Sequence, residues 1–256
     1  MDRWRGKTAL ITGASSGIGL ATAERLARSG MTVIGCARNI APIEELQQRT
    51  LGTGVVHAIR CDVTQEAEIV AMFREIEGVH GGVDVLVNNA GLAHSDDLLT
   101  RSVGQWRQMV DTNILGLSTC AREAVRLMVK HGIRGGHIIN MNSVSGHKIN
   151  DYNAIHFYAA TKHMVTALTE GLRREVAALG TSIRVTVRSL SPGATLTDFA
   201  NRWLGEAAVR DTPYVKEGFT FLESGDIADA IVYVLSEPAH VTVQEMILVP
   251  TEQKSG

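Results

Sequence analysis

Two side chains four residues apart, Tyr158 and Lys162, could move a proton together. They begin a stretch that we expect to be helical, and residues i and i+4 of a helix lie on one face. A lysine ammonium beside a tyrosine hydroxyl favours the phenolate and lowers a tyrosine pKa that starts at about 10. Such a tyrosine is a useful acid or base near neutral pH. This spacing alone usually marks a pair on the protein surface. Only the surrounding sequence can therefore indicate whether Tyr158 and Lys162 form a catalytic pair.

The context is set by polar residues that follow two apolar, strand-like runs. Asn140-Met141-Asn142-Ser143 ends the run before Tyr158, with Ser143 just past its carboxyl end, and Asn88-Asn89-Ala90-Gly91 ends an earlier run. Ligands of open α/β sheets bind at the carboxyl ends of the strands. We therefore expect Ser143, Tyr158 and Lys162 to share one site.

A glycine-rich turn follows the first strand-like run. A strand, such a turn and a helix N-terminus together form an anion site, because backbone N–H groups and the helix dipole attract a phosphate. Gly13 would permit the turn, Gly17 would let the ligand approach, and Gly19 would let the helix pack on the strand. The spacing is G-x-x-x-G-x-G, not the commoner G-x-G-x-x-G. The residues expected to hold the phosphates are Thr12, Gly13, Ser15, Ser16, Gly17, Ile18 and Gly19.

The end of the second strand-like run indicates which nucleotide is bound. It reads Cys36-Ala37-Arg38-Asn39, whereas an NAD enzyme usually carries a carboxylate there for the ribose hydroxyls. A guanidinium suits a 2′-phosphate, and such a contact contributes roughly 1.5–3 kcal/mol, or about tenfold to a hundredfold in preference. Arg38 and Asn39 therefore predict NADP(H) as the cofactor, against the alternative of a solvated arginine at a strand end.

The elements that must position these residues alternate between short apolar runs and longer helical patterns. Runs such as Val83-Asp84-Val85-Leu86-Val87 are typical of strands buried on both faces. We predict one Rossmann-like α/β domain over residues 1–256, with a doubly wound parallel sheet of about seven strands and helices on both faces. The expected strands are 7–12, 32–37, 54–61, 83–88, 136–142, 183–190 and 246–249, and the expected helices are 17–29, 43–50, 65–77, 103–130, 157–178 and 225–236.

The segment after the sixth expected strand breaks this alternation. It begins at Pro192-Gly193 and mixes aromatic and apolar residues up to Leu222. Connections of this length are uncommon in compact domains and are often functional. We expect a small helical insert at about 194–224 that covers an apolar substrate, with an ordinary surface excursion as the alternative.

Composition excludes several other classes of protein. The chain has 256 residues, with 25 lysines and arginines against 27 aspartates and glutamates. A nucleic-acid or membrane surface as main partner would need clustered positive charge. No apolar run approaches the roughly 18 residues of a membrane span, and the polar N-terminal segment predicts no signal peptide. Cys36, Cys61 and Cys120 have no metal-binding spacing. We expect a cytoplasmic protein with free thiols and no metal.

In combination, these motifs resemble the classical short-chain dehydrogenase/reductase family. The matching residues run in the family order along nearly the whole chain: Thr12-Gly13-x-x-x-Gly17-x-Gly19, Asp62, Asn88-Asn89-Ala90-Gly91, Asn113, Ser143, Tyr158-x-x-x-Lys162 and Pro192-Gly193-x-x-x-Thr197. Within the family the chain is similar to a subgroup of animal cytosolic enzymes that includes insect NADP-dependent farnesol dehydrogenases and a vertebrate ketosteroid reductase. That similarity lies in stretches such as Gly35-Cys36-Ala37-Arg38, Ser145-Gly146-His147, His156-Phe157-Tyr158 and Pro250-Thr251-Glu252-Gln253.

The resemblance implies a catalytic role for four residues. Tyr158 would exchange the hydroxyl proton, and Lys162 would bind the nicotinamide ribose and lower the Tyr158 pKa. Ser143 would hydrogen-bond the carbonyl oxygen, so that Ser143 and Tyr158 both touch substrate. Asn113 would hold a water that continues the proton relay from Lys162.

The resemblance also implies how the cofactor lies along the site. Asp62 and Val63 would contact adenine, and Asn89, Ala90 and Gly91 would line its ribose side. The nicotinamide end, which includes Tyr158 and Lys162, would meet Pro192, Gly193, Thr195 and Thr197. The hydride would pass between nicotinamide and the carbinol or carbonyl carbon.

The resulting prediction is an NADP-dependent alcohol dehydrogenase or carbonyl reductase for a small apolar substrate such as farnesol or farnesal, another isoprenoid or aliphatic alcohol, or a ketosteroid. One alternative, a 3-oxoacyl thioester reductase, would need a basic patch. Another, a non-catalytic NADP-sensing protein, would typically lack a catalytic residue. His94, His147 and His156 could touch substrate, although structural or solvent-facing roles are favoured. Because family members commonly pair through the helices at 103–130 and 157–178, we expect a homodimer or homotetramer.

Overall fold

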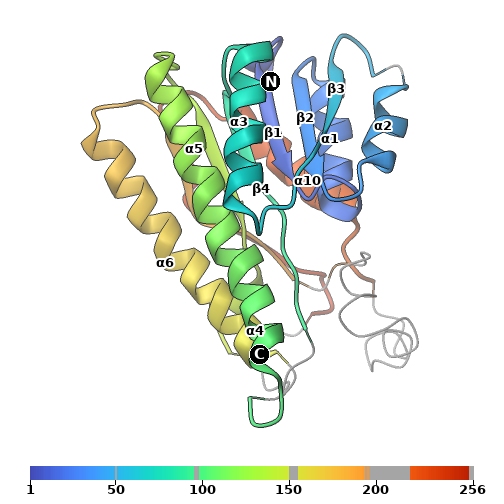
Figure 1. Cartoon of the computed structure of the whole chain (residues 1–256), viewed down its shortest axis with the longest axis vertical. Coiled ribbons are helices and arrows are strands. Elements are labelled where there is room, and N and C mark those ends of the chain that lie inside the picture. The colour runs from blue at the N-terminus through green and yellow to red at the C-terminus, as the bar shows by residue number, and fades with distance from the viewer. Residues whose placement is uncertain (50, 95–97, 150–154, 194, 196–219, 254–256) are drawn as a thin grey trace.

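A seven-stranded parallel sheet organises the described part of the chain, with strand order β3-β2-β1-β4-β5-β6-β7 (Figure 1). The structure is a computed structural model and describes residues 1–49, 51–94, 98–149, 155–193, 195 and 220–253. The strands are β1 (Thr8–Thr12), β2 (Thr32–Ala37), β3 (Val55–Arg60), β4 (Val85–Asn88), β5 (His137–Met141), β6 (Arg184–Pro192) and β7 (Met246–Leu248).

Helices connect these strands and cover both faces of the sheet (Figure 1). The described helices are η1 (Asp2–Trp4), α1 (Gly17–Arg28), α2 (Ala41–Gln47), α3 (Glu66–His80), α4 (Val103–Val110), η2 (Asp111–Gly116), α5 (Leu117–Lys130), η3 (Val144–Gly146), α6 (His156–Ala178) and α10 (Ser224–Ser236). Parallel pairing of all neighbouring strands confirms the predicted Rossmann-like, doubly wound α/β fold.

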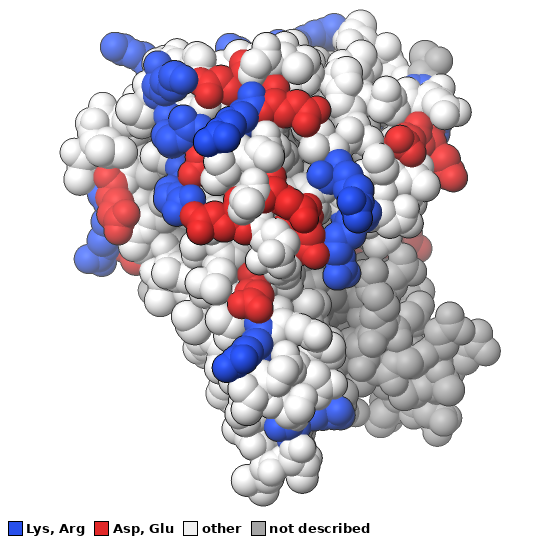
Figure 2. Space-filling model, viewed as in Figure 1, with Lys and Arg blue, Asp and Glu red and all other residues white. Residues whose placement is uncertain are grey.

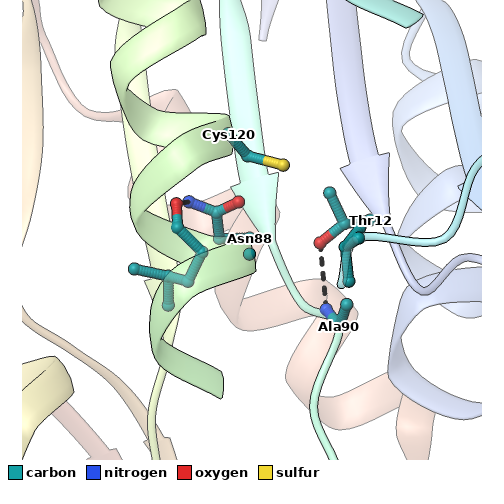
Figure 3. A pocket seen from close by; sticks show the side chains of 7 residues that line it. Thr12, Asn88, Ala90 and Cys120 are labelled. Atoms are coloured by element: carbon teal, nitrogen blue, oxygen red, sulfur yellow. Dashed lines mark hydrogen bonds between the residues drawn. The ribbon is translucent and has the colours of Figure 1, made fainter. Parts of the chain in front are cut away.

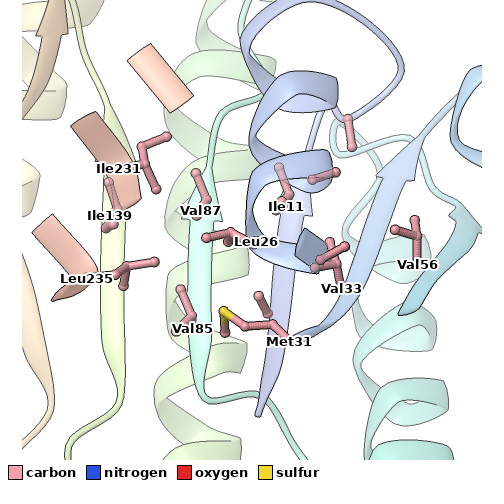
Figure 4. Close-up of a cluster of buried hydrophobic side chains, with 14 of the residues drawn as sticks. Ile11, Leu26, Met31, Val33, Val56, Val85, Val87, Ile139, Ile231 and Leu235 are labelled. Carbon is pink, nitrogen blue, oxygen red and sulfur yellow. The ribbon is translucent and has the colours of Figure 1, made fainter. Parts of the chain in front are cut away.

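Alternation along each strand divides the core into two layers. In β1, Ala9 and Ile11 belong to one apolar cluster, whereas Leu10 belongs to the other. The first cluster lies under α1, α2 and α10, where Leu26 and Ile231 meet the sheet (Figure 4). The second lies under α3, α5 and α6. Burial on both faces explains why the strands read as nearly continuous apolar runs.

The chain reverses direction across the sheet between β1 and β4. From β1 it runs to β2 and β3 on one side, and then returns to β4 on the other side of β1. Ile11 of β1 is consequently paired with both Gly35 of β2 and Val87 of β4. A ligand crevice forms at the carboxyl ends of strands at such a switch point. The turns that follow β1, β2 and β4 all lie at this edge of the sheet.

One expected helix has an irregular segment in the structure, and one expected insert is described only in part. The expected single helix at 103–130 is formed by α4, the π-helical segment η2 and α5, because the backbone changes its hydrogen-bond pattern around Asn113. The expected insert at 194–224 lies largely outside the described residues. Of it, the structure describes Thr195, which forms an isolated parallel bridge with Leu222, and residues 220–224.

The helices and the surface show features typical of a globular chain. Among the described residues, no helix combines the length and apolar character that a membrane crossing requires. The face in Figure 2 shows basic and acidic side chains interspersed. All three cysteines are buried and free.

Candidate active site

The turn after β1 has the geometry of a phosphate cradle. Gly13 has φ +66° and Gly17 has φ +53°, the left-handed region that favours glycine. A side chain on Gly13 would bring its Cβ to 2.9 Å from the Cα of Ala90. A Cβ on Gly19 would collide with the carbonyl oxygen of Gly13. The three glycines therefore bring the turn, α1 and the chain after β4 within contact of one another.

The N-terminus of α1 faces this turn with its amides available. Ser16 is the N-cap residue, and no side-chain cap bonds to the first turn of α1. Unsatisfied N–H groups at a helix N-terminus, together with the helix dipole, attract an anion. Ser15, Ser16, Gly17 and Ile18 are partly exposed, as an approaching phosphate requires.

Hydrogen bonds lock the turn after β1 to the turn after β4. The Thr12 hydroxyl accepts from the backbone N–H group of Ala90 at 3.0 Å (Figure 3). It also accepts from the backbone N–H group of Asn89 at 3.0 Å. The Asn89 side chain donates to the carbonyl oxygens of Thr12 and Gly13 at 2.9 and 3.1 Å. These turns carry the residues predicted to hold pyrophosphate and ribose, and the structure brings them together.

The ends of β2 and β3 lie beside the cradle. Arg38 follows β2 with an exposed side chain, and within the described residues it forms no hydrogen bond or ion pair. Asn39 instead accepts from the Ala41 amide at 3.2 Å, at the start of α2. After β3, Asp62 accepts from the Thr64 amide and hydroxyl at 3.0 and 2.9 Å. A free guanidinium here suits an added phosphate, and the cradle suits a pyrophosphate, so the residues fit an NADP molecule.

A small recess lies between these turns and α5 (Figure 3). It leaves almost no room for a water molecule, whereas a ligand pocket has a volume of roughly 300–1,000 Å³. The Oδ1 atom of Asn88 is buried there without a hydrogen-bond partner among the described residues. The recess is therefore too small to be a ligand site by itself. Its lining is Thr12, Val63, Asn88, Ala90, Gly116, Leu117 and Cys120.

The predicted catalytic side chains meet at the same edge of the sheet. Tyr158 and Lys162 are buried in the first turns of α6, with the lysine Nζ atom 5.7 Å from the centroid of the tyrosine ring. Lys162 donates to the carbonyl oxygen of Met141 at 2.9 Å. Ser143 caps η3, where its hydroxyl accepts from the Ser145 amide at 3.2 Å, and it also hydrogen-bonds Tyr158.

Burial controls the protonation of the tyrosine and the lysine. It raises the pKa of Tyr158 to about 12, and the hydrogen bond with Ser143 opposes this rise. It also lowers the pKa of Lys162 to about 8. The expected lowering of the tyrosine pKa by the lysine charge is therefore not found. The cost of burying a phenolate outweighs the effect of the hydrogen bond with Ser143 in this site.

Asn113 occupies the π-helical segment η2 and ties it to two neighbours. Its amide nitrogen donates to the Leu92 carbonyl at 2.9 Å and to the Thr161 hydroxyl at 3.2 Å. Its Oδ1 atom accepts from the Leu92 amide at 2.9 Å. Gly91 lies between Asn113 and Lys162, since a Cβ there would be 3.4 Å from Oδ1 and 4.0 Å from Nζ. π-Helical turns are frequent at functional sites.

Several supporting residues escaped sequence analysis. Thr161 accepts from Asn113 and donates to the carbonyl oxygen of Tyr158 at 2.7 Å. Thr169 accepts from the Asn140 side chain at 2.9 Å, which joins α6 to β5. The available signal was their spacing, because both threonines lie on the buried face of α6 that carries Lys162.

The nicotinamide-side residues lie partly within the described chain. Pro192 ends β6, the Gly193 amide donates to the Leu248 carbonyl at 2.7 Å, and the Thr195 hydroxyl donates to the Gly193 carbonyl at 3.0 Å. Thr197 lies outside the described residues.

Two of the three histidines considered from sequence have clear partners. His94 Nε2 is 2.8 Å from the Gln108 side-chain oxygen, which lies on α4. His147 is held between Ser191 and Glu245. His156 begins α6. The partners of His94 and His147 fit the structural roles that the sequence favoured.

Comparison with known proteins decides the family. The sequence profile of the short chain dehydrogenases matches residues 7–207. The chain belongs to this short-chain dehydrogenase family. It is 44% identical to dehydrogenase/reductase SDR family member 11 of Homo sapiens, over 99% of this chain and 97% of that protein. It is 42% identical to farnesol dehydrogenase of Aedes aegypti, over 99% of this chain and 100% of that protein.

A solved structure supports the same assignment to the short-chain dehydrogenase family. The closed form of serine dehydrogenase complexed with NADP+ matches with a TM-score of 0.86 and 31% identity, and the match covers 97% of this chain and 96% of that one. The chain is therefore an oxidoreductase of a family that uses NAD(P) and acts on small substrates. The resemblance to the animal subgroup is confirmed by the two relatives above.

Proposed function

We propose that this short-chain dehydrogenase uses NADP(H) to interconvert an apolar alcohol and its aldehyde or ketone. The observation that carries the proposal is the group formed by the buried Tyr158 and Lys162 with the partly exposed Ser143, at the sheet edge that also carries the phosphate cradle. A proton donor beside a dinucleotide cradle is what carbonyl reduction requires.

The chain's own residues would bind and orient the cofactor. The turn Thr12–Gly19 and the N-terminus of α1 hold the pyrophosphate, Arg38 and Asn39 hold the 2′-phosphate side, and Asp62 and Val63 hold the adenine. Toward the other end lie Asn89, Ala90 and Gly91, then Lys162 with Tyr158, and then Pro192, Gly193, Thr195 and Thr197. When bound, NADPH supplies the hydride.

The catalytic step at the protein is a proton transfer. Ser143 orients the carbonyl oxygen through its hydroxyl group. Tyr158, which keeps its proton at neutral pH because its pKa is raised to about 12, donates to that oxygen. The Nζ atom of Lys162 lies 5.7 Å from the centroid of the Tyr158 ring. Because Gly91 has no side chain, it leaves space between Lys162 and Asn113 for a water that would relay the proton. A protonated tyrosine can serve as the acid in carbonyl reduction, and its deprotonated form can serve as the base in the reverse reaction.

The apolar surroundings of Tyr158 support an apolar substrate. Ala93 and Met109 pack with Tyr158, and Trp106 and Phe157 stack beside it with ring centroids 4.9 Å apart and an interplanar angle of 6°. One relative named above is a farnesol dehydrogenase. Farnesal, other isoprenoid or aliphatic aldehydes and ketosteroids are therefore the first substrates to test.

The test measures NADPH oxidation with farnesal and with a panel of ketosteroids. We expect turnover by the wild-type chain and a loss of about 10²–10⁴ in kcat for Tyr158→Phe, because the proton donor is removed. Tyr233→Phe, on the exposed face of α10, is the matched control and should keep full activity. Undiminished turnover in Tyr158→Phe would remove that residue from the proposed role.

The choice of NADP over NAD is tested separately. Arg38→Ala should lower the preference for NADPH about tenfold to a hundredfold, because a charged hydrogen bond to the 2′-phosphate is lost. Arg134→Ala, at an exposed arginine in the turn before β5, is the control. Equal affinity of the unmodified chain for NADPH and NADH would contradict the proposal.

Two alternatives make different predictions. A 3-oxoacyl thioester reductase would reduce oxoacyl thioesters in preference to farnesal and ketosteroids. A non-catalytic sensor would bind NADPH tightly and turn over no carbonyl compound.

We further propose a cytoplasmic homodimer or homotetramer that pairs through α4–α5 and α6, where Leu115, Met164 and Leu168 are exposed.

A further inference from the structure

His147 links three parts of the chain that meet beside the candidate active site. It follows η3, the turn that Ser143 caps. Its Nε2 atom is 2.7 Å from the Ser191 hydroxyl oxygen, at the end of β6. Its Nδ1 atom is 3.0 Å from a carboxylate oxygen of Glu245, immediately before β7. Ser191 is fully buried, so its hydroxyl is enclosed by protein.

The carboxylate sets the hydrogen-bond roles of the ring. A carboxylate oxygen can only accept, so Nδ1 of His147 carries the hydrogen and donates to Glu245. In the neutral ring Nε2 then accepts, and the Ser191 hydroxyl donates to it. The histidine is oriented at both nitrogens, in the way that a carboxylate partner orients a ring elsewhere in proteins.

The backbone pairing between β5 and β6 is irregular near His147. β5 and β6 pair in register from His137 to Ile139, but the register shifts before Met141 pairs with Leu190. Such irregularities bend a strand and disrupt the ladder locally. The His147 bridge lies just beyond the shift, between the turn after β5 and the end of β6. It therefore connects the two strand ends where regular pairing is interrupted.

We propose that His147 is a positioning residue for the reaction proposed above, on which this inference rests. By holding Ser191, it fixes the end of β6 at Pro192 and the following Gly193 relative to the Ser143 turn. Pro192 and Gly193 are the expected contacts of the nicotinamide end, and Ser143 is the expected contact of the carbonyl oxygen. The distance between hydride donor and carbonyl carbon is then set in part by the His147 bridge.

The experiment compares His147→Ala, His147→Gln, Ser191→Ala and the double variant His147→Ala/Ser191→Ala. Each is assayed for kcat, for KM, for the Kd of NADPH, for the emission of bound NADPH and for thermal unfolding. Gln can replace the Nε2 contact, so it is the conservative variant. His131→Ala is the matched control, because His131 makes a similar pair with Glu77 at 2.7 Å after α5.

We expect His147→Ala to lower kcat about tenfold to a hundredfold, since a small misplacement of reacting groups has effects of that size. The Kd of NADPH should change little, because most predicted cofactor contacts lie on the other strands. His147→Gln should recover much of the loss. The double variant should be no slower than His147→Ala, because both changes break one bridge. His131→Ala should behave as wild type.

Other results would overturn the inference. These are an unchanged kcat in His147→Ala, independent additive losses in the double variant, or a fall in thermal stability with no separate fall in kcat. If the wild-type chain reduces no carbonyl compound, the proposed function fails. The emission of bound NADPH then decides the inference by itself: a changed spectrum in His147→Ala supports it, and an unchanged one overturns it.

Discussion

Burial decides how individual residues of the site behave. Tyr158 and Lys162 are both almost fully enclosed, and each is pushed toward its neutral form. In the sequence, only the charge of the lysine is visible, and this charge predicts a lower tyrosine pKa. Desolvation depends on the packing of η3 and of the residues around α6, which the sequence does not show. The identities of the residues were predictable, and their protonation states were not.

A stability measurement tests the burial of Lys162. The pKa of this lysine is about 8 in the folded chain and 10.5 in the unfolded one. Between these values the unfolded state binds more protons, so the contribution of Lys162 to stability rises with pH. From pH 8 to 10.5 the wild-type chain should gain roughly 3 kcal/mol relative to Lys162→Met. Denaturant unfolding across this pH range measures the difference.

The matched control for that measurement is Lys130→Met, at an exposed lysine paired with Glu77. Its difference from wild type should show no such rise between pH 8 and 10.5. If the curves of the wild-type chain and Lys162→Met run parallel over this range, Lys162 is not desolvated as described.

At the scale of elements, the phosphate cradle depends on backbone contact between α1 and two turns. The strands and helices around it were predictable, because apolar runs and glycine punctuation mark them directly. The π-helical segment at Asn113 was not, since α- and π-helical turns have similar side-chain patterns over so short a stretch. Its hydrogen bonds to Leu92 and Thr161 come from elements distant in sequence.

The close approach in the cradle predicts the effect of Gly19→Ala. The added methyl group would meet the Gly13 carbonyl and the Asn89 side chain. We expect a loss of about 1–3 kcal/mol in stability and weaker NADPH binding. Gly78→Ala in α3 is the control, because a Cβ there meets nothing within 4 Å. It should stabilise the chain by about 0.4–1 kcal/mol. Equal NADPH affinity in both variants would refute the close-approach argument.

At the scale of the whole molecule, the two-layer core closes around the sheet and leaves apolar side chains exposed on its outer helices. Leu115 of η2 and Leu168 of α6 are among them, on neighbouring helices. A face of this kind suits a two-fold symmetric interface, in which each residue is used by both copies.

Sedimentation equilibrium tests this assembly. The wild-type chain should sediment as a dimer or tetramer, and Leu168→Arg should shift it toward smaller species, because each two-fold contact would bury two unpaired charges. Val79→Arg, at an exposed position of α3, should leave the assembly unchanged. A monomeric wild-type chain would contradict the proposal directly.

The sequence by itself determined the fold class and the family, because apolar runs, glycine turns and motif order are local properties of the chain. The proposal of Arg38 as a phosphate ligand rests on the same kind of local pattern. The tertiary structure alone decided the contacts that join distant segments. Thr161 reaches Asn113 only after α6 packs against η2, and His147 reaches Ser191 and Glu245 only after β5, β6 and β7 lie side by side. Desolvation and long-range hydrogen bonds depend on the packed neighbours of a residue, and no local pattern encodes those neighbours.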